Sequence, residues 1–241
     1  MTFCCVYGAQ DLSESVTSKP KIKLYCLYTP QFQVMYERYF LPSIKDDIQI
    51  IAREYQQECS SGTFRSDGWD KTMLRKLELL KEAVEEHWND KIFIYSDADI
   101  IFLKPALEDL LTCLGDHDFV VQQGWPQNAL CAGFFVMRGN EKTLKLITTA
   151  HRLLEEKISV DDQVALRKAL KEFKKGEISW RFLPSEQFPN GYRVLKTGAA
   201  ELYSANSEIV LDDSIILFHA NCCIGLENKY DFLMRVQAAG K

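Results

Sequence analysis

Two carboxylates, Asp97 and Asp99, stand between two very hydrophobic stretches in the segment KIFIYSDADIIFLKP, residues 91–105. The run before them predicts a buried β-strand, and residues two apart in a strand point to the same side. Both carboxylates are therefore expected to converge at the carboxyl end of that strand. Without a counter-charge this arrangement is repulsive, and a divalent cation is the simplest relief. Oxygen ligands suit Mg2+ or Mn2+, which often keep open positions for substrate phosphates.

An Asp-x-Asp pattern has a plainer explanation, in which one carboxylate caps the following turn and the other is solvated. The strong strand before the pair and the apolar run after it favour the metal site. Haloacid-dehalogenase-like phosphotransferases use a similar pair, but they follow it with small residues and a Thr or Val, whereas IIFLKP follows here. They also place a later acidic pair directly after a strand, whereas Asp212 and Asp213 precede theirs. The phosphotransferase is the weaker alternative.

Predicted strands and helices alternate along the chain and must position these groups. Hydrophobic patterning predicts strands at residues 21–29, 48–55, 91–96, 118–124, 132–139, 178–184 and 214–220. Amphipathic spacing predicts helices at residues 69–88, 104–114, 141–157, 160–175 and 228–237. This order predicts an α/β domain with a largely parallel or mixed sheet. In open sheets of this kind, ligands bind beyond the carboxyl ends of the strands.

Four motifs follow one another along the chain: FIYSDADIIFLKP, AGFFVMRGN, VDDQVAL and ILFHANCCIGLENK. In this order they resemble the DxD strand, the Asn-Ala-Gly segment, the Asp-Gln motif and the carboxy-terminal His motif of nucleotide-diphospho-sugar transferases with the GT-A fold. The pattern is most similar to the retaining families that include glycogenin-like and plant wall α-glycosyltransferases, over about residues 21–236. The resemblance implies a Rossmann-like α/β fold with a central mixed, mostly parallel sheet flanked by helices.

The same resemblance implies a metal site for Mn2+ or Mg2+. Asp99 would be a direct metal ligand, and Asp97 would contact both the metal and the ribose. His219 would complete the protein ligands as a neutral imidazole at a strand end. A lone His usually belongs to the core, but the matching motif after SIILF favours the ligand assignment here.

A second group of residues is assigned to the nucleotide-sugar donor: Tyr28, Thr29, Lys76, Asp97, Gly133 and Lys229. Tyr28 and Thr29, after the first strand, would meet the nucleotide base. Lys229 matches the family Lys that reaches the diphosphate, and Lys76 matches a basic residue that faces the donor. Arg75, one position earlier, is the alternative to Lys76.

Asp162 and Gln163 are the predicted catalytic residues. In the resembling families, the Asp holds sugar hydroxyls and the Gln lies near the anomeric carbon, opposite the leaving group. Because an amide is a poor nucleophile, this favours front-face attack by the acceptor over a covalent intermediate. The simpler alternative is a helix cap at Asp161 or Asp162, and the two acids could also divide these tasks.

Composition excludes several classes of protein. The chain has 241 residues, 46% of them hydrophobic and 26% charged, which is typical of a globular protein. Its net charge of -5 argues against binding to the nucleic-acid backbone. We expect a flexible tail at residues 1–20 and a single GT-A domain at residues 21–241. We find no secretory signal and no run long enough for a membrane span.

The eight cysteines show no CxxC pair and no zinc-ligand spacing. We therefore expect free thiols and a cytoplasmic protein. The predicted function is a metal-dependent retaining glycosyltransferase, a hexosyl- or pentosyltransferase, with a UDP-sugar as donor and a glycan, glycolipid or protein as acceptor. The alternative from another class is a catalytically silent sugar-nucleotide-binding or scaffold domain of the same fold.

Overall fold

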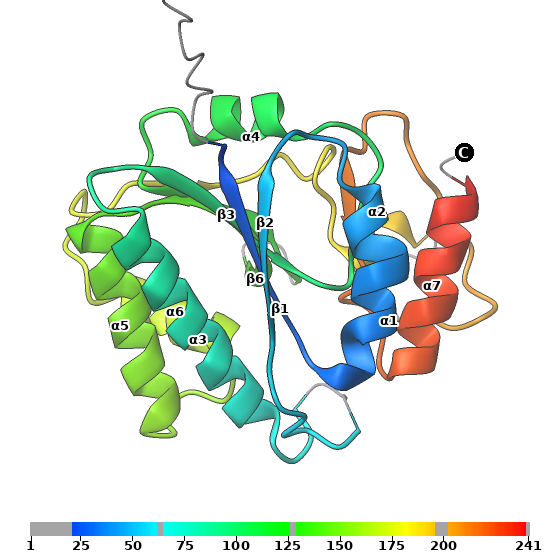
Figure 1. Cartoon of the computed structure of the whole chain (residues 1–241), viewed down its shortest axis with the longest axis horizontal. Coiled ribbons are helices and arrows are strands. Elements are labelled where there is room, and N and C mark those ends of the chain that lie inside the picture. Colours follow the sequence, from blue (N-terminus) through cyan, green and yellow to red (C-terminus); the bar gives the residue numbers. More distant parts are fainter. Residues whose placement is uncertain (1–20, 62–64, 126–128, 196–201, 240–241) are drawn as a thin grey trace, which may run out of the picture.

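A computed structural model of the chain describes residues 21–61, 65–125, 129–195 and 202–239. The predicted tail at residues 1–20 lies outside the described residues. Figure 1 shows a central sheet with α3, α5 and α6 on one side and α1, α2 and α7 on the other. No helix among the described residues is long and apolar enough to cross a membrane.

The main sheet has the strand order β2-β1-β3-β6-β5-β7. Its strands are β1 (Lys23–Tyr28), β2 (Gln49–Glu54), β3 (Ile92–Asp97), β5 (Phe119–Gln123), β6 (Leu130–Arg138) and β7 (Trp180–Phe182). β1 pairs in parallel with β2 and β3, and β5 pairs in parallel with β7. β6 runs antiparallel to both of its neighbours, β3 and β5. The sheet is therefore mixed and mostly parallel, as the sequence predicts.

A second sheet contains only β4 (Ile100–Phe102) and β8 (Leu217–His219), which pair antiparallel. The larger helices are α3 (Trp69–Glu86), α4 (Leu107–Leu114), α5 (Glu141–Glu155), α6 (Asp162–Leu170) and α7 (Leu226–Ala239). Shorter helical turns are η1 (Pro30–Phe32), α1 (Gln33–Met35), η2 (Tyr36–Phe40), α2 (Leu41–Ser43) and η3 (Gly191–Val194).

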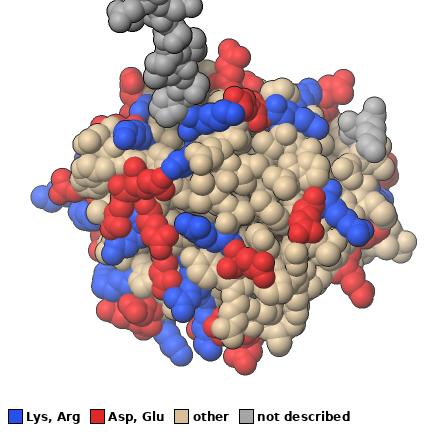
Figure 2. Space-filling view, viewed as in Figure 1, with Lys and Arg blue, Asp and Glu red and all other residues tan. Residues whose placement is uncertain are grey.

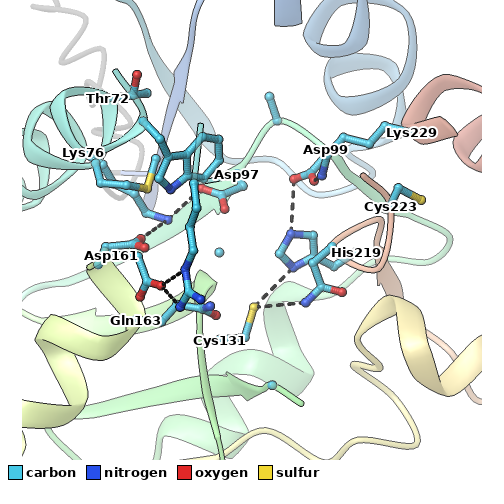
Figure 3. Close-up of a pocket in the computed structure, with 18 of the residues that line it drawn as sticks. Thr72, Lys76, Asp97, Asp99, Cys131, Asp161, Gln163, His219, Cys223 and Lys229 are labelled. Atoms are coloured by element: carbon cyan, nitrogen blue, oxygen red, sulfur yellow. Dashed lines mark hydrogen bonds and ion pairs between the residues drawn. The ribbon is translucent and has the colours of Figure 1, made fainter. Parts of the chain in front are cut away.

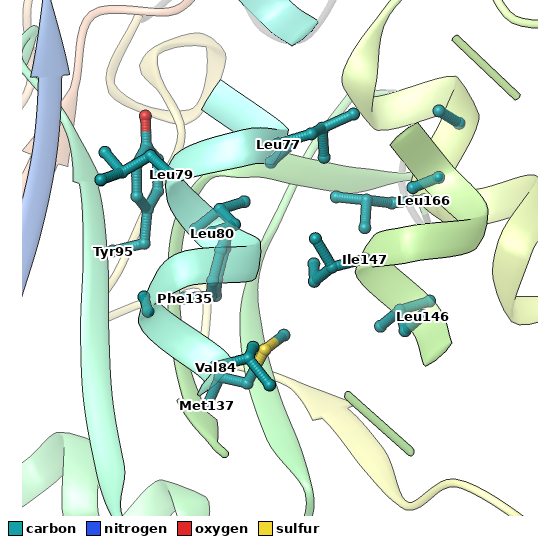
Figure 4. Close-up of a cluster of buried hydrophobic side chains, with 14 of the residues drawn as sticks. Leu77, Leu79, Leu80, Val84, Tyr95, Phe135, Met137, Leu146, Ile147 and Leu166 are labelled. Atoms are coloured by element: carbon teal, nitrogen blue, oxygen red, sulfur yellow. The ribbon is translucent and has the colours of Figure 1, made fainter. Parts of the chain in front are cut away.

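Both faces of the main sheet are buried, because successive side chains of a strand point to opposite sides. On β3, Phe93 and Tyr95 join the cluster under α3, α5 and α6, whereas Ile94 joins the cluster on the other face. Figure 4 shows the first cluster, where Leu77 and Leu80 of α3 meet Ile147 of α5. This packing fixes α3 and α6 against the carboxyl ends of the strands.

The predicted strand positions are confirmed to within about two residues at most ends, but two predicted helix bounds were wrong and two features were missed. The predicted helix at residues 160–175 ends at Leu170, and residues 171–173 form turns. The helix predicted from residue 104 begins at Leu107, after Pro105, and a proline disfavours the helical conformation of the residue before it, here Lys104. The helical segment at residues 30–43 and the short strand β4 were not predicted.

The six cysteines within the described ranges are free thiols, as expected from the sequence: Cys26, Cys59, Cys113, Cys131, Cys222 and Cys223. Cys4 and Cys5 lie outside the described residues. On the face of the molecule in Figure 2, acidic and basic side chains are interspersed around a broad area of other residues.

Candidate active site

A pocket of about 510 Å3 opens at the carboxyl ends of β1 and β3 and is closed by α3, α6 and the segment after β8. It lies where the connections of an open α/β sheet leave a crevice for ligands. All the predicted site residues line this pocket: Tyr28, Thr29, Lys76, Asp97, Asp99, Gly133, Asp162, Gln163, His219 and Lys229. The fold therefore brings together segments that are up to about two hundred residues apart in the chain.

Asp97, Asp99 and His219 form one compact cluster, shown in Figure 3. Each offers one ligand atom, and these atoms all lie within 4.8 Å of one another. The pairing of β4 with β8 creates this proximity, because Ile100 stands opposite His219. The backbone N–H of Ala220 also donates to the carbonyl of Asp99 at 2.9 Å. Short β4 therefore holds the second carboxylate against the imidazole.

Asp99 is buried between two cationic partners. Nε2 of His219 lies 3.2 Å from one of its oxygens, and the ammonium of Lys229 contacts the other. Burial opposes the charge on Asp99, but Lys229 and His219 outweigh it and hold the pKa of that carboxyl well below its usual range. Burial lowers the pKa of His219, but Asp99 and Cys131 outweigh that effect and raise it to about 10.

Lys76 occupies the opposite wall, where its side chain is almost fully buried. Its ammonium lies 2.9 Å from a carboxylate oxygen of Asp97 and 2.9 Å from one of Asp162. Burial disfavours the charged amine, but the two carboxylates outweigh it and raise the pKa of Lys76. Arg75 points away and pairs with Glu78 at 2.8 Å. Of the two alternatives from the sequence, Lys76 is the one that faces the pocket.

Three consecutive residues at the start of α6 have different tasks. Asp161 caps the helix by accepting a hydrogen bond from the N–H of Val164 at 2.8 Å. The carboxylate of Asp162 pairs with Lys76. Burial raises the pKa of the Asp162 carboxyl, and this effect is larger than the opposite effect of Lys76. Oε1 of Gln163 accepts a hydrogen bond from the N–H of Ala132 at 3.3 Å. A cap at Asp161 thus leaves Asp162 and Gln163 directed into the pocket.

Gly133 allows β6 to pass directly beneath the cluster. A Cβ at this position would lie 2.2 Å from Cε1 of His219 and 2.7 Å from Oδ2 of Asp97. Real Cβ atoms do not approach other atoms so closely, so a larger residue would displace a candidate ligand. The close approach of β6 to His219 and Asp97 therefore explains why residue 133 is a glycine.

The end of β1 forms the remaining wall. The ring of Tyr28 stacks on that of Tyr36 with centroids 4.5 Å apart and an interplanar angle of 9°. Thr29 is buried beside it. An aromatic platform at a strand end is suited to a planar ring such as a nucleotide base.

Sequence reasoning missed other residues of the pocket. Arg65 has a positive φ of 58° and contacts the carboxylate of Asp161 through Nε at 3.0 Å. Trp125 and Tyr192 form an aromatic pair with centroids 6.1 Å apart. Nothing local marks these residues, because they lie outside the four motifs, Arg65 and Trp125 between regular elements and Tyr192 in the short helical turn η3. A glycan has apolar C–H faces that such aromatic side chains can contact.

The donor atoms of Asp97, Asp99 and His219 fit a divalent cation. Two carboxylates and an imidazole suit Mn2+ and also accommodate Mg2+, which prefers oxygen ligands. Gly133 lets the backbone of β6 pack against His219 and Asp97, where a Cβ would collide with both side chains. Within the part of the chain that the structure describes, Asp97, Asp99 and His219 are the group of His, Cys, Asp or Glu side chains that lie close enough together to hold a metal ion.

Comparison with known proteins finds relatives of this chain in sequence and in fold. The family model described as nucleotide-diphospho-sugar transferase matches residues 41–233. A UDP-galactose:fucoside alpha-3-galactosyltransferase of Dictyostelium discoideum is 29% identical over 176 residues, which are 64% of this chain and 25% of that protein. The chain thus spans about a quarter of the length of this relative.

Two solved structures share the fold. A glycosyltransferase involved in glycosylation of the major capsid of PBCV-1 has a TM-score of 0.60 at 10% identity, covering 89% of this chain and 100% of that one. The galactosyltransferase LgtC, solved in complex with donor and acceptor sugar analogs, has a TM-score of 0.51 at 12% identity, covering 83% of this chain and 87% of that one. The family match over most of the chain, together with this fold, shows that the chain belongs to the nucleotide-diphospho-sugar transferases and is a glycosyltransferase of the GT-A fold.

Proposed function

We propose that this glycosyltransferase is metal-dependent, uses a UDP-sugar as donor, and retains the anomeric configuration of the transferred sugar. The observation that carries the proposal is the convergence of Asp97, Asp99 and His219 between two lysines, the buried Lys76 and the half-buried Lys229. Two carboxylates and two ammonium groups around one pocket can bind a cation and a diphosphate together. UDP-galactose is the first donor to test, because the curated relative uses it.

Asp97, Asp99 and His219 would hold the ion, either Mn2+ or Mg2+. When bound, it would neutralise the negative charge that develops on the departing diphosphate. Lys229 is placed beside Asp99 and would contribute a further positive charge to the diphosphate. Tyr28 and Thr29 would bind the base at the end of β1, and Gly133, which lines the pocket, would lie beside the donor.

In the transfer, the bond between the anomeric carbon and the β-phosphate oxygen breaks, and a bond to the acceptor oxygen forms on the same face. The proton of the acceptor hydroxyl passes to the departing phosphate oxygen. Asp162, held by Lys76, would fix the sugar through its hydroxyls. Gln163 would orient charge near the anomeric carbon without forming a bond, because an amide is a poor nucleophile. The acceptor would be a glycan, a glycolipid or a protein.

The stereochemical proposal is tested with Asp162→Asn and Gln163→Ala. Asp162→Asn should lower turnover by orders of magnitude, because its interaction would act mainly in the transition state. Gln163→Ala should lower turnover less. Proton NMR of the product's anomeric coupling is expected to show an α-linked product from an α-linked donor. A β-linked product would refute retention and the task given to Gln163.

Metal dependence is tested by calorimetric titration of UDP with Mn2+ present or removed. Asp99→Asn, which keeps the shape of the side chain, should abolish the Mn2+-dependent part of UDP binding. Asp213→Asn is the matched control, since this exposed aspartate lies outside the pocket, and it should behave like the wild type. Unchanged UDP affinity of Asp99→Asn in the presence of Mn2+ would refute the metal site.

A further inference from the structure

A buried glutamine lies behind His219, on the side away from the pocket. Gln122, on β5, has no exposed surface. Its amide oxygen Oε1 lies 2.8 Å from Nδ1 of His219. The other ring nitrogen, Nε2, faces Asp99 at 3.2 Å. None of the four sequence motifs contains this glutamine.

The orientation of the Gln122 amide is determined by its other contacts. Its nitrogen Nε2 donates to the carbonyl of Pro189 at 2.9 Å and lies 3.3 Å from that of Phe188. An amide nitrogen only donates and an amide oxygen only accepts. Rotating the amide by half a turn would set its oxygen against two carbonyl oxygens. The amide oxygen of Gln122 therefore faces Nδ1 of His219.

An acceptor at Nδ1 determines which nitrogen of the ring can bind a metal. Because Gln122 offers only a lone pair at 2.8 Å, Nδ1 must carry a proton and donate it. The proton that the ring gives up to bind a metal is then the one on Nε2, so the free lone pair of the neutral ring lies on Nε2, which faces Asp99 and the cluster. The hydrogen bond also fixes the rotation of the ring.

Cys131 is the competing partner of the same nitrogen. Its Sγ lies 3.5 Å from Nδ1 of His219, as Figure 3 shows, and a thiol could donate a proton there. However, the sulfur already accepts a hydrogen bond from Nδ2 of Asn221 at 3.4 Å. A bare Nδ1 would also face the Gln122 oxygen lone pair to lone pair at a much shorter distance. Gln122 is thus the stronger partner.

The backbone around Gln122 is built for this contact. The pairing of β5 with β6 shifts register between Val121 and Gln122. Such an irregularity re-aims a side chain. The carbonyls that hold the amide belong to a segment that runs beside β8, where Asn190 forms a bridge with His219. The same glutamine therefore ties β5 and this segment to the end of β8.

We propose that Gln122 is a positioning residue for His219: it keeps the proton on Nδ1 and turns the lone pair of Nε2 toward the metal that Asp97 and Asp99 would bind. The inference rests on the proposed metal site, since it assigns a purpose to the orientation of one of its ligands. Residues that orient metal-binding histidines typically affect metal affinity 10- to 100-fold when they are replaced.

The first test measures Mn2+ affinity by electron paramagnetic resonance of the free ion, with no donor present. Gln122→Met, of similar length, should weaken binding roughly 10- to 100-fold. Gln123→Met, the same substitution at the next residue of β5, should bind like the wild type. Weakened binding in Asp99→Asn but not in Gln122→Met would overturn the Gln122 proposal alone. Equal affinity of wild type and Asp99→Asn would overturn the metal site itself, and with it the purpose assigned to Gln122.

The second test observes the ring of His219 directly, by nitrogen-15 NMR of the metal-free protein. The wild type and Gln123→Met should show a proton on Nδ1 that exchanges slowly with solvent. Gln122→Met should lose that protection. Absence of the Nδ1 proton in the wild type would overturn the proposal without any variant. Loss of protection in Cys131→Ala but not in Gln122→Met would assign the contact to the thiol and would also overturn it.

Discussion

The charged residues of the site are paired with one another before any ligand binds. Lys76 is shared by Asp97 and Asp162, and Asp99 is shared by His219 and Lys229. A buried ion pair is costly to break by removing one partner, because the remaining charge stays buried and uncompensated. Substitutions at this site are therefore expected to affect stability as well as catalysis, and controls must separate the two effects.

Lys76→Met should lower the free energy of unfolding by about 3–5 kcal/mol, because it leaves the carboxylates of Asp97 and Asp162 without their shared cation. Arg75→Met, the same kind of change one residue earlier, removes only a surface ion pair with Glu78, which water screens, and should cost far less. Urea denaturation of both variants measures the difference. Equal losses would contradict the assignment of Lys76 to the buried network.

Gly133→Ala should weaken Mn2+ binding, because the added methyl group would displace His219 or Asp97. The crowding should also cost about 1–3 kcal/mol of stability. Gly176→Ala is the control: its φ of 82° makes a side chain unfavourable there, but its Cβ would meet no atom within 4 Å. Mn2+ titration of both variants, followed by thermal unfolding, separates the effects. Unchanged Mn2+ affinity in Gly133→Ala would refute the close contact.

At the level of the elements, Asp118 joins β5, α5 and β7 outside the pocket. Its carboxylate accepts hydrogen bonds from Lys142 at 2.9 Å, from Asn140, the cap of α5, at 3.0 Å, and from the N–H of Ser179, before β7, at 2.8 Å. Burial raises the pKa of Asp118, but these partners outweigh it and lower the pKa below its usual value. The carboxylate is therefore more favourable in the folded chain than in the unfolded one.

A lowered folded pKa gives a definite pH dependence. The stabilisation by Asp118 should be complete above the unfolded pKa of about 3.9 and should be lost as the pH falls through the folded pKa below it. Asp118→Asn should cost roughly 1.5–3 kcal/mol at pH 7, as expected for hydrogen bonds to a charged group. The difference from the wild type should shrink below about pH 4. Denaturant unfolding between pH 3 and pH 7 measures this, with Asp116→Asn as control, and a difference independent of pH would contradict the assignment.

At the level of the whole molecule, the pocket joins the beginning and the end of the described chain. Tyr28 comes from the first strand and Lys229 from the last helix, and both line the same cavity. A ligand that fills this pocket makes contacts that exist only in the folded state. Binding should therefore stabilise the domain as one unit.

UDP together with Mn2+ should raise the melting temperature. At a ligand concentration about 100 times the Kd, the stabilisation is about 2.7 kcal/mol. For a domain of this size this corresponds to roughly 5–10 °C. UDP with a chelator should give a clearly smaller shift, and Asp99→Asn should not respond to Mn2+. A shift that is independent of Mn2+ would contradict the joint binding of metal and nucleotide. Differential scanning fluorimetry is sufficient to measure it.

The sequence alone predicted the described strands except β4, the acidic pair at the end of β3, a helix that begins near Asp161 and Asp162, and the order of the family motifs. These features depend on neighbouring residues, because strand alternation, helix spacing and helix capping are local patterns. The match to residues 41–233 confirms the family that those motifs resembled. It also decides against the phosphotransferase alternative, in which Asp97 would be the nucleophile.

Only the tertiary structure decided how these parts meet. The choice of Lys76 over Arg75 depended on the rotation of α3 against the sheet, and the contact between Asp99 and His219 depended on the pairing of β4 with β8. The hydrogen bond from His219 to Gln122 joins residues 97 positions apart. Such contacts leave no local pattern, because the packing of distant segments creates them.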